Sequence, residues 1–102
     1  MQPQGHLQIL SNILDYNMSP QEALDAPRFC ISDGEGACSF EEGMSPDVVE
    51  ELKTMGHNVA SAIVVSHERS LFGRAQIIMK NPLTGVLQGA SDGRSDGFAC
   101  GY

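Results

Sequence analysis

Basic residues are scarce in this 102-residue chain. Six lysines and arginines stand against thirteen aspartates and glutamates, which gives a formal charge of -7. Binding to nucleic acid depends on clustered Lys and Arg that neutralise phosphates, so this composition argues against a nucleic-acid partner. Apolar runs are also short, since none approaches the roughly 20 residues that span a bilayer. We therefore expect no nucleic-acid partner and no membrane partner.

Zinc-binding patterns are absent as well. The chain has no C-x-x-C pair, and His57 and His67 are not at ligand spacing, so we expect no metal. The three cysteines, Cys30, Cys38 and Cys100, are an odd number that cannot pair fully within one chain. Cys30 and Cys38 flank a predicted turn and could come close, whereas buried free thiols are the commoner state. Reducing surroundings, and so the cytoplasm rather than the periplasm, are the expectation.

The opening residues, MQPQGH, have neither the basic nor the apolar region of a signal peptide. A hydrophobic content of 41% is enough to form a core. No linker, internal repeat or low-complexity segment divides the chain. We expect one continuous segment over residues 1–102.

The first helix is expected over residues 5–16. Leu7, Leu10 and Leu14 recur at i, i+3 and i+7, which predicts an apolar stripe that belongs to the core. Asn17 is a suitable left-handed stop.

Two further helices are marked by their first residues. Ser19 and Glu22 form the pattern of a capping box before a short helix over residues 20–25. A third helix is expected from Ser45-Pro46, with its end at Gly56.

Five strands are predicted by β-branched and apolar runs between turn residues. They cover residues 28–32, 37–41, 58–66, 70–80 and 86–90. The last three are consistent with an antiparallel meander, and the tail after residue 90 is expected to be irregular. The order of elements predicts an α+β fold, with sheet strands covered by helices.

Single residues do not define an active site. His6 could be a general base, but no nucleophile lies at a recognisable spacing, so a polar helix opening is expected. Asp92 and Asp96 resemble a calcium loop only loosely, because the EF-hand spacing and its terminal Glu are missing. Gly73, inside a predicted strand, favours a packing role over a ligand contact.

Six blocks of sequence occur along the chain in a recognisable order. They are QPQGHLQ (residues 2–8), PQEALDAPRF (20–29), GH (56–57), FGRAQII (72–78), GASD with Arg94 (89–94) and GY (101–102). In this order and spacing they resemble the gamma-glutamyltranspeptidase family, and the QPQGH form resembles its bacterial and acylase-like branch.

The resemblance implies an N-terminal-nucleophile hydrolase, whose two sheets are sandwiched between helix layers (αββα). This chain would be the C-terminal portion of the small subunit. Such a proenzyme cuts itself, and the new N-terminal Thr becomes the nucleophile, with its own amine as base. The Thr attacks a gamma-glutamyl amide such as glutathione, and the acyl group passes to water, an amino acid or a peptide. No cofactor is implied.

The family's catalytic residues do not carry over onto this chain. The nucleophilic Thr, the Gly-Gly that holds the oxyanion and the residues that hold the glutamyl group all lie upstream of the QPQGH block. Thr54 and Thr84 are the only threonines, and neither matches the family motif. We expect no catalytic residue here, and only Met1 and Gln2 near the substrate, at the positive end of the first helix.

Two functions follow as hypotheses. The first is a C-terminal fragment of a gamma-glutamyltranspeptidase-like enzyme, inactive alone. Its partners would be the large subunit and the N-terminal half of the small subunit, or it would self-associate. The second is a stand-alone, non-catalytic binding or dimerisation module that keeps the scaffold. Strand edges and apolar faces left open in a chain this short predict an oligomeric, aggregation-prone or partly disordered molecule unless a complementary chain binds.

Overall fold

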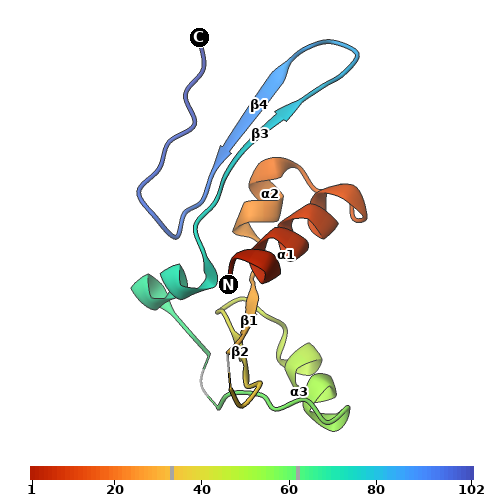
Figure 1. Cartoon of the computed structure of the whole chain (residues 1–102), viewed down its shortest axis with the longest axis vertical. Helices are drawn as coiled ribbons and strands as arrows, with labels where there is room; N and C mark the ends of the chain where they lie inside the picture. Colours follow the sequence, from red (N-terminus) through yellow and green to blue (C-terminus); the bar gives the residue numbers. More distant parts are fainter. Residues whose placement is uncertain (33, 62) are drawn as a thin grey trace.

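The structure is a computed structural model that describes residues 1–32, 34–61 and 63–102. The described residues form two hairpins, three α-helices and one 3₁₀-helix in an elongated molecule of 46 × 27 × 24 Å (Figure 1). The elements are α1 (Gln2–Leu14), α2 (Pro20–Asp25), β1 (Phe29–Ile31), β2 (Cys38–Phe40), α3 (Pro46–Thr54), a 3₁₀-helix η1 (Ser66–Phe72), β3 (Gln76–Lys80) and β4 (Leu87–Ser91). None of the described helices is long and apolar enough to cross a membrane.

The core lies where α1 and α2 pack against one face of the β3–β4 hairpin (Figure 1). Its buried members are Ile9 from α1, Ala23 and Leu24 from α2, and Ala90 from β4. Strand β3 brings Ile77 onto the same cluster. This arrangement confirms the predicted α+β class, in which helices cover antiparallel strands.

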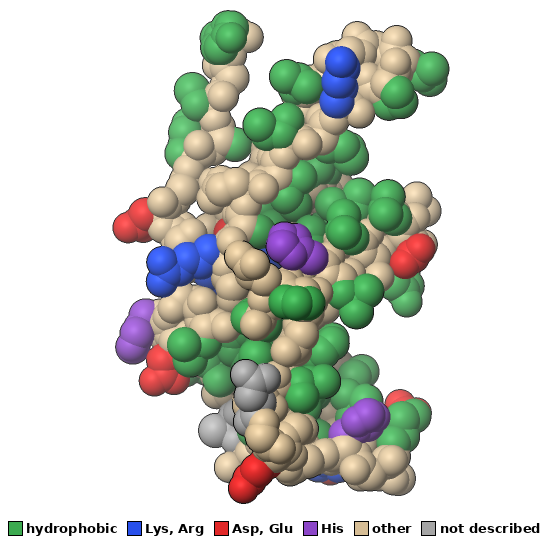
Figure 2. All heavy atoms as spheres, in the orientation of Figure 1, with side chains coloured by type: hydrophobic (Ala, Val, Ile, Leu, Met, Phe, Trp, Pro, Cys, Tyr) green, Lys and Arg blue, Asp and Glu red, His purple; other side chains and the backbone are tan. Residues whose placement is uncertain are grey.

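Helix α1 buries a different side from the one that we predicted. Leu7, Leu10 and Leu14 are 64%, 52% and 72% exposed, whereas Ile9 is buried and Ile13 packs against the core. The helix is apolar on both sides, and in this chain only the isoleucine side meets α2 and the hairpin. The stripe therefore lies on the surface, and Figure 2 shows hydrophobic side chains gathered over this part of the molecule.

Helix α2 matches its prediction in full. Ser19 Oγ accepts a hydrogen bond from the backbone N–H of Glu22, and the Glu22 carboxylate accepts one from the N–H of Ser19. Pro20 occupies the first helical position, as the pattern predicts. Helix α1 begins earlier than predicted, at Gln2, and Asn17 adopts the predicted left-handed conformation after its end (φ 54°).

The two strands predicted over residues 28–32 and 37–41 form the antiparallel β1–β2 hairpin, with Cys30 opposite Ser39 and Ile31 opposite Cys38. Of the predicted turn between the strands, residue 33 lies outside the described residues. Because neighbouring residues on a strand point to opposite faces, Cys30 and Cys38 project from opposite sides of the hairpin. Both are half-buried free thiols, and Cys100 is an exposed free thiol.

The predicted strand over residues 58–66 does not form. Val59 and Val64 make two isolated parallel bridges to Cys38 and Glu41, on either side of a stretch that includes the undescribed residue 62. The bridged residues Val59 and Val64 are five positions apart, whereas their partners Cys38 and Glu41 are three positions apart. The two segments therefore cannot form a continuous ladder.

The predicted strand over residues 70–80 is also wrong in its first half. Residues 70–72 belong to η1, which ends at Phe72, and Gly73 follows with a φ of 93° that breaks the extended path. The β3–β4 hairpin then forms around the turn at residues 81–85, and β4 runs one residue later than predicted. Among the described residues β3 pairs with β4 alone, so a two-stranded hairpin takes the place of the expected three-stranded meander.

Candidate functional site

The first residues of α1 line a small hollow of about 140 Å³. Met1 and Gln2, the two residues that we predicted to lie near substrate, are both in its wall. Opposite them, the segment from Phe72 to Ala75 and the side chain of Arg28 complete the lining. The structure thus brings the two predicted residues together with the PRF and FGRAQ blocks of the sequence.

Gly73 lies in this wall next to Met1 and Arg28. A Cβ atom at Gly73 would lie 3.8 Å from Met1 Cγ and 3.9 Å from Arg28 Nη1, so the space itself is adequate. The φ of 93° is what favours glycine there. Its carbonyl oxygen accepts a hydrogen bond from Arg28 Nη1 at 3.3 Å, which supports the predicted packing role.

Behind the hollow lies a network of buried charges. Arg28, Glu41 and Asp92 are 2%, 0% and 1% exposed. Arg28 Nη2 lies 2.8 Å from Asp92 Oδ2, and the backbone N–H of Arg28 donates to Glu41 Oε2 at 2.8 Å. Arg28 Nη1 and Nη2 also donate to the carbonyls of Phe72 and Leu24, which fixes the guanidinium between η1 and α2.

Arg94 closes the network from the segment after β4. It forms an ion pair with Glu41, and its Nη1 lies 3.0 Å from Asp92 Oδ1. It also donates to the carbonyls of Leu24 (2.6 Å) and Ala26 (3.0 Å), two acceptors at the end of α2 that the helix itself leaves unpaired. Two arginines and two carboxylates thus neutralise one another and satisfy a helix end.

The network shifts the pKa values of its carboxyl groups. Burial alone would raise the pKa of Glu41, but hydrogen bonds from Arg94 and from the Arg28 N–H outweigh it and hold that pKa below its usual value. The pKa of Asp92 is likewise lowered, because bonds from Arg94 and Arg28 outweigh the effect of burial. Burial lowers the pKa of Arg94, but the two carboxylates more than compensate and raise it. All three groups therefore remain charged at neutral pH.

Three of the four charged residues of this network, Arg28, Asp92 and Arg94, belong to the blocks that resemble the family. The sequence also suggested Asp92, loosely, as part of a calcium loop. In the structure it pairs with two arginines instead, and within the described residues no group of three His, Cys, Asp or Glu could hold a metal. Glu41 was missed, because an acidic residue before a polar turn carries no sequence pattern that marks burial.

The hollow holds no nucleophile of its own. None of the residues in its wall is Ser, Thr or Cys. The Thr54 hydroxyl donates to the Glu50 carbonyl within α3, and Thr84 lies in the turn between β3 and β4. His6 is in the wall, but without a hydroxyl or thiol partner there. The arrangement can therefore shape and support a reaction centre, and the described residues do not complete one.

Comparison with solved structures gives the class of fold. The chain superposes on the crystal structure of cephalosporin acylase from Bacillus halodurans with a TM-score of 0.81 and 38% sequence identity, over 92% of this chain and 17% of that one. The helices and antiparallel strands described above thus belong to the α+β fold of N-terminal-nucleophile hydrolases.

The family follows from the sequence. The family model described as gamma-glutamyltranspeptidase matches residues 1–102, and the chain belongs to that family. The glutathione hydrolase proenzyme of Escherichia coli is 37% identical over 97 residues, which are 94% of this chain and 15% of that protein. The glutathione hydrolase-like YwrD proenzyme of Bacillus subtilis is 36% identical over 98% of this chain and 19% of its own length. The chain thus spans less than a fifth of these relatives.

Proposed function

We propose that this chain is the C-terminal part of the small subunit of a gamma-glutamyltranspeptidase-like enzyme. The whole enzyme would transfer a gamma-glutamyl group from glutathione-type amides to water, amino acids or peptides. The observation that carries the proposal is a family match over every residue of the chain, combined with a hollow that has family residues in its wall and no nucleophile. On this proposal the chain is inactive until a complementary part brings the catalytic Thr.

The role of this chain would be to support the reaction centre. The first turn of a helix has backbone N–H groups without helical partners, and the helix dipole adds about half a positive charge there. In α1 the Met1 position makes no side-chain capping bond, and the first turn contains no acidic residue. This positive end, beside Met1 and Gln2, is suited to stabilise the negative oxygen that forms when the Thr attacks an amide carbonyl.

The buried charges would hold the wall that faces that helix end in place. Arg28 joins η1 and the end of α2 behind the hollow, and it lines the hollow itself. A shift of about 1 Å in a positioning group is enough to reduce catalysis strongly. We assign Arg28 a positioning role on this basis, and not a catalytic one.

The proposal is tested by hydrolysis of a chromogenic gamma-glutamyl anilide. The 102-residue chain is assayed alone and after mixing with a truncated relative, the Bacillus subtilis protein without the stretch that this chain matches. That stretch of the relative, expressed separately, is the positive control. We expect no activity from the chain alone and activity after mixing.

The variant pair Gln2→Ala and Glu51→Ala links the activity to the hollow. Gln2 is in its wall, whereas Glu51 is exposed on α3. We expect Gln2→Ala to reduce the activity of the mixture about tenfold, of the order of one lost hydrogen bond to a charged group, and Glu51→Ala to leave it unchanged. Activity of the chain alone would contradict the proposal. Association without activity, while the control stretch restores it, would favour the non-catalytic module.

A further inference from the structure

Two glutamines of α1 bond to the backbone of β1. The side-chain amide of Gln4 donates to the Ile31 carbonyl at 3.0 Å and accepts from the Ile31 N–H at 2.8 Å. Gln8 makes the same two bonds with Phe29, at 3.0 and 2.9 Å. A glutamine side chain offers a carbonyl oxygen and an NH₂ group. Each of the two side chains therefore pairs with β1 as a peptide unit of a neighbouring strand would.

These bonds lie on the outer edge of the β1–β2 hairpin. Arg28 and Ser32, on either side of β1, take part in backbone hydrogen bonds with the residues that flank β2. Because successive residues of a strand direct their backbone groups to opposite edges, Phe29 and Ile31 face away from β2. No strand of the described residues lies on that edge. The two glutamines therefore satisfy the backbone groups there.

The spacing of the glutamines matches the spacing of the strand. Residues four apart on an α-helix are separated by about 6 Å along its axis. Alternate residues of a strand are separated by about 6.6 Å. Gln4 and Gln8 therefore meet Ile31 and Phe29 together, with α1 and β1 running in opposite directions. One such pair of bonds fixes a point on the helix, and a second pair also fixes the rotation of the helix about its axis.

Packing holds α1 at a different place. Its core residues are Ile9 and Ile13, in later turns, and the described core cluster contains no residue of β1 or β2. Among the described residues of the first turn, Gln4 alone makes a side-chain hydrogen bond outside the helix. Gln8 also donates to the Gln4 carbonyl at 3.0 Å, which ties the first turn to the second. Polar bonds to β1 therefore set the position of this end of the helix.

We propose that Gln4 and Gln8 are positioning residues, which hold the first turn of α1 in the orientation that the reaction needs. The inference rests on the proposed function, in which the N–H groups of this turn stabilise a negative oxygen. Such groups act at hydrogen-bond distance, and a misplacement of about 1 Å is enough to cost about a hundredfold in rate. Arg28, the residue before β1, is anchored in the buried charge network. The glutamine bonds join the end of the helix to that anchor.

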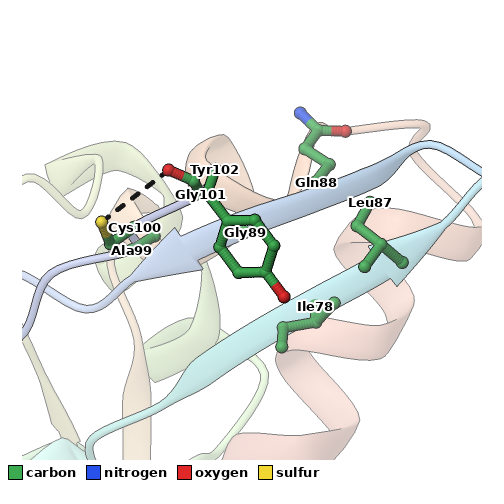
Figure 3. Close-up of a pocket in the computed structure, with 8 residues that line it drawn as sticks. All are labelled: Ile78, Leu87, Gln88, Gly89, Ala99, Cys100, Gly101 and Tyr102. Carbon is green, nitrogen blue, oxygen red and sulfur yellow. Dashed lines mark hydrogen bonds between the residues drawn. The ribbon is translucent and has the colours of Figure 1, made fainter.

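Gln21 of α2 provides a matched control. It makes the same pair of bonds with Ser91 at the end of β4, at 3.0 and 3.3 Å. Like Gln8, it also donates within its own helix, to Asp25 at 3.0 Å. A glutamine does not form such a pair at every position, because the Gln88 side chain projects from β4 beside a hollow of about 700 Å³ and makes no hydrogen bond to the residues drawn with it (Figure 3). Gln21 therefore tests the bond itself, without the first turn of α1.

Amide hydrogen exchange of the full chain, followed by NMR, measures the bonds directly. Methionine matches glutamine in length and helix propensity but has no amide, so each variant removes the bonds and keeps the shape. We expect Gln4→Met to speed exchange of the Ile31 N–H at least tenfold and to leave that of Ser91 unchanged. Gln21→Met should do the reverse. Circular dichroism checks that each variant keeps its fold.

The positioning role is measured by anilide hydrolysis of the chain mixed with a saturating concentration of the truncated relative. When a group that acts only in the transition state is misplaced, kcat falls and KM does not change. We expect Gln4→Met and Gln8→Met each to lower kcat about tenfold, with KM changed less than twofold. Gln21→Met should leave both constants within about twofold of the parent chain, because it bonds to β4 and not to β1.

The outcomes separate this inference from the proposed function. Faster exchange at Ile31 with an unchanged kcat would overturn the positioning role alone. Unchanged exchange in Gln4→Met would show that the bond is not formed, and an equal loss of kcat in Gln21→Met would reduce the effect to lost stability. Either result also overturns the inference. A parent chain that gives no activity on mixing, while the relative's own stretch does, would overturn the proposed function and this inference together.

Discussion

Glu41 is a carboxylate without access to water, and its charge is tolerated only because donors surround it. Its oxygens accept from Arg94 and from the backbone of Arg28, and Arg69 lies 3.4 Å away at the edge of the network. Removing one member of a buried ion pair leaves the other charge uncompensated, which costs more than the pair itself contributes. The four central side chains therefore act as one unit.

We expect Glu41→Gln to destabilise the fold by about 3–5 kcal/mol, the usual cost of a broken buried pair. This is comparable to the whole stability of a small domain, so the variant is expected to be largely unfolded. The matched control is Glu50→Gln, which removes a 69% exposed partner of Lys53 and should cost less than about 1 kcal/mol. Urea unfolding followed by circular dichroism measures both, and equal effects would contradict the buried network.

Acid should weaken the fold in a defined direction. Both Glu41 and Asp92 have lowered pKa values in the folded chain, so their contribution is complete above the unfolded-state pKa, about 4. It is lost as the pH falls through the lower, folded-state pKa. The urea midpoint should thus be flat near neutral pH and decline below about pH 4. The exposed Asp47→Asn variant should give the same profile, and a decline centred near pH 6 would point to histidines instead.

The pair Cys30 and Cys38 shows how far the sequence predicts the surroundings of single residues. The positions of Cys30 and Cys38 around a turn left a disulfide open as an alternative. The observed register decides against it, because the two side chains point to opposite faces. Burial and the neighbouring Cys30 raise the pKa of Cys38, which keeps it protonated. The pairing of the two strands sets which way each side chain points, and the composition of the turn does not specify that pairing.

At the scale of helices and strands, sequence patterns predicted the structure correctly where all of the contacts join residues close together in the chain. The capping box of α2 was predicted residue by residue, since all of its partners lie within four positions. The strand predicted over residues 58–66 failed, because its pairing depends on a distant segment with a different spacing between bridges. Val59 and Val64 each make a single bridge beside β2, and composition does not reveal whether a ladder is continuous.

The two serine caps offer a matched pair of substitutions. Ser19 Oγ accepts from Glu22 N–H, whereas Ser45, at the start of α3, makes no side-chain capping bond. We expect Ser19→Ala to cost about 1 kcal/mol and Ser45→Ala to cost only a few tenths of that. The difference is measured by urea unfolding of both variants side by side. Equal losses would mean that the α2 cap is not formed in solution.

At the scale of the whole molecule, the chain leaves apolar surface uncovered. The stripe of Leu7, Leu10 and Leu14 was predicted to be core, and the pattern is sound for a helix with neighbours on both sides. A single sequence does not show whether the element that covers one side of a helix belongs to the same chain or to another chain. For the same reason the site was predicted only in outline: Met1 and Gln2 line one hollow, but their role near a substrate remains a prediction.

The exposed stripe should make the isolated chain associate with itself. Replacing Leu7, Leu10 and Leu14 by Gln removes the exposed apolar surface without touching the buried Ile9, so the helix should persist and self-association should fall. Sedimentation velocity over a range of concentrations measures the change. A control with Gln at Ser11, which lies among these residues, should associate as the parent chain does. A monomeric parent chain with a sharp thermal transition would contradict the prediction.

The buried ion network also governs the order in which the chain can fold. Helix turns and hairpins form in about microseconds from neighbouring residues. The Arg94 contacts instead join positions 53 and 70 residues apart, to Glu41 and Leu24, so they wait for large loops to close. Until then each charged group stays hydrated. It loses its water in the last step, when all of its partners come together. The network should therefore form late in folding, and its loss should mainly raise the unfolding rate.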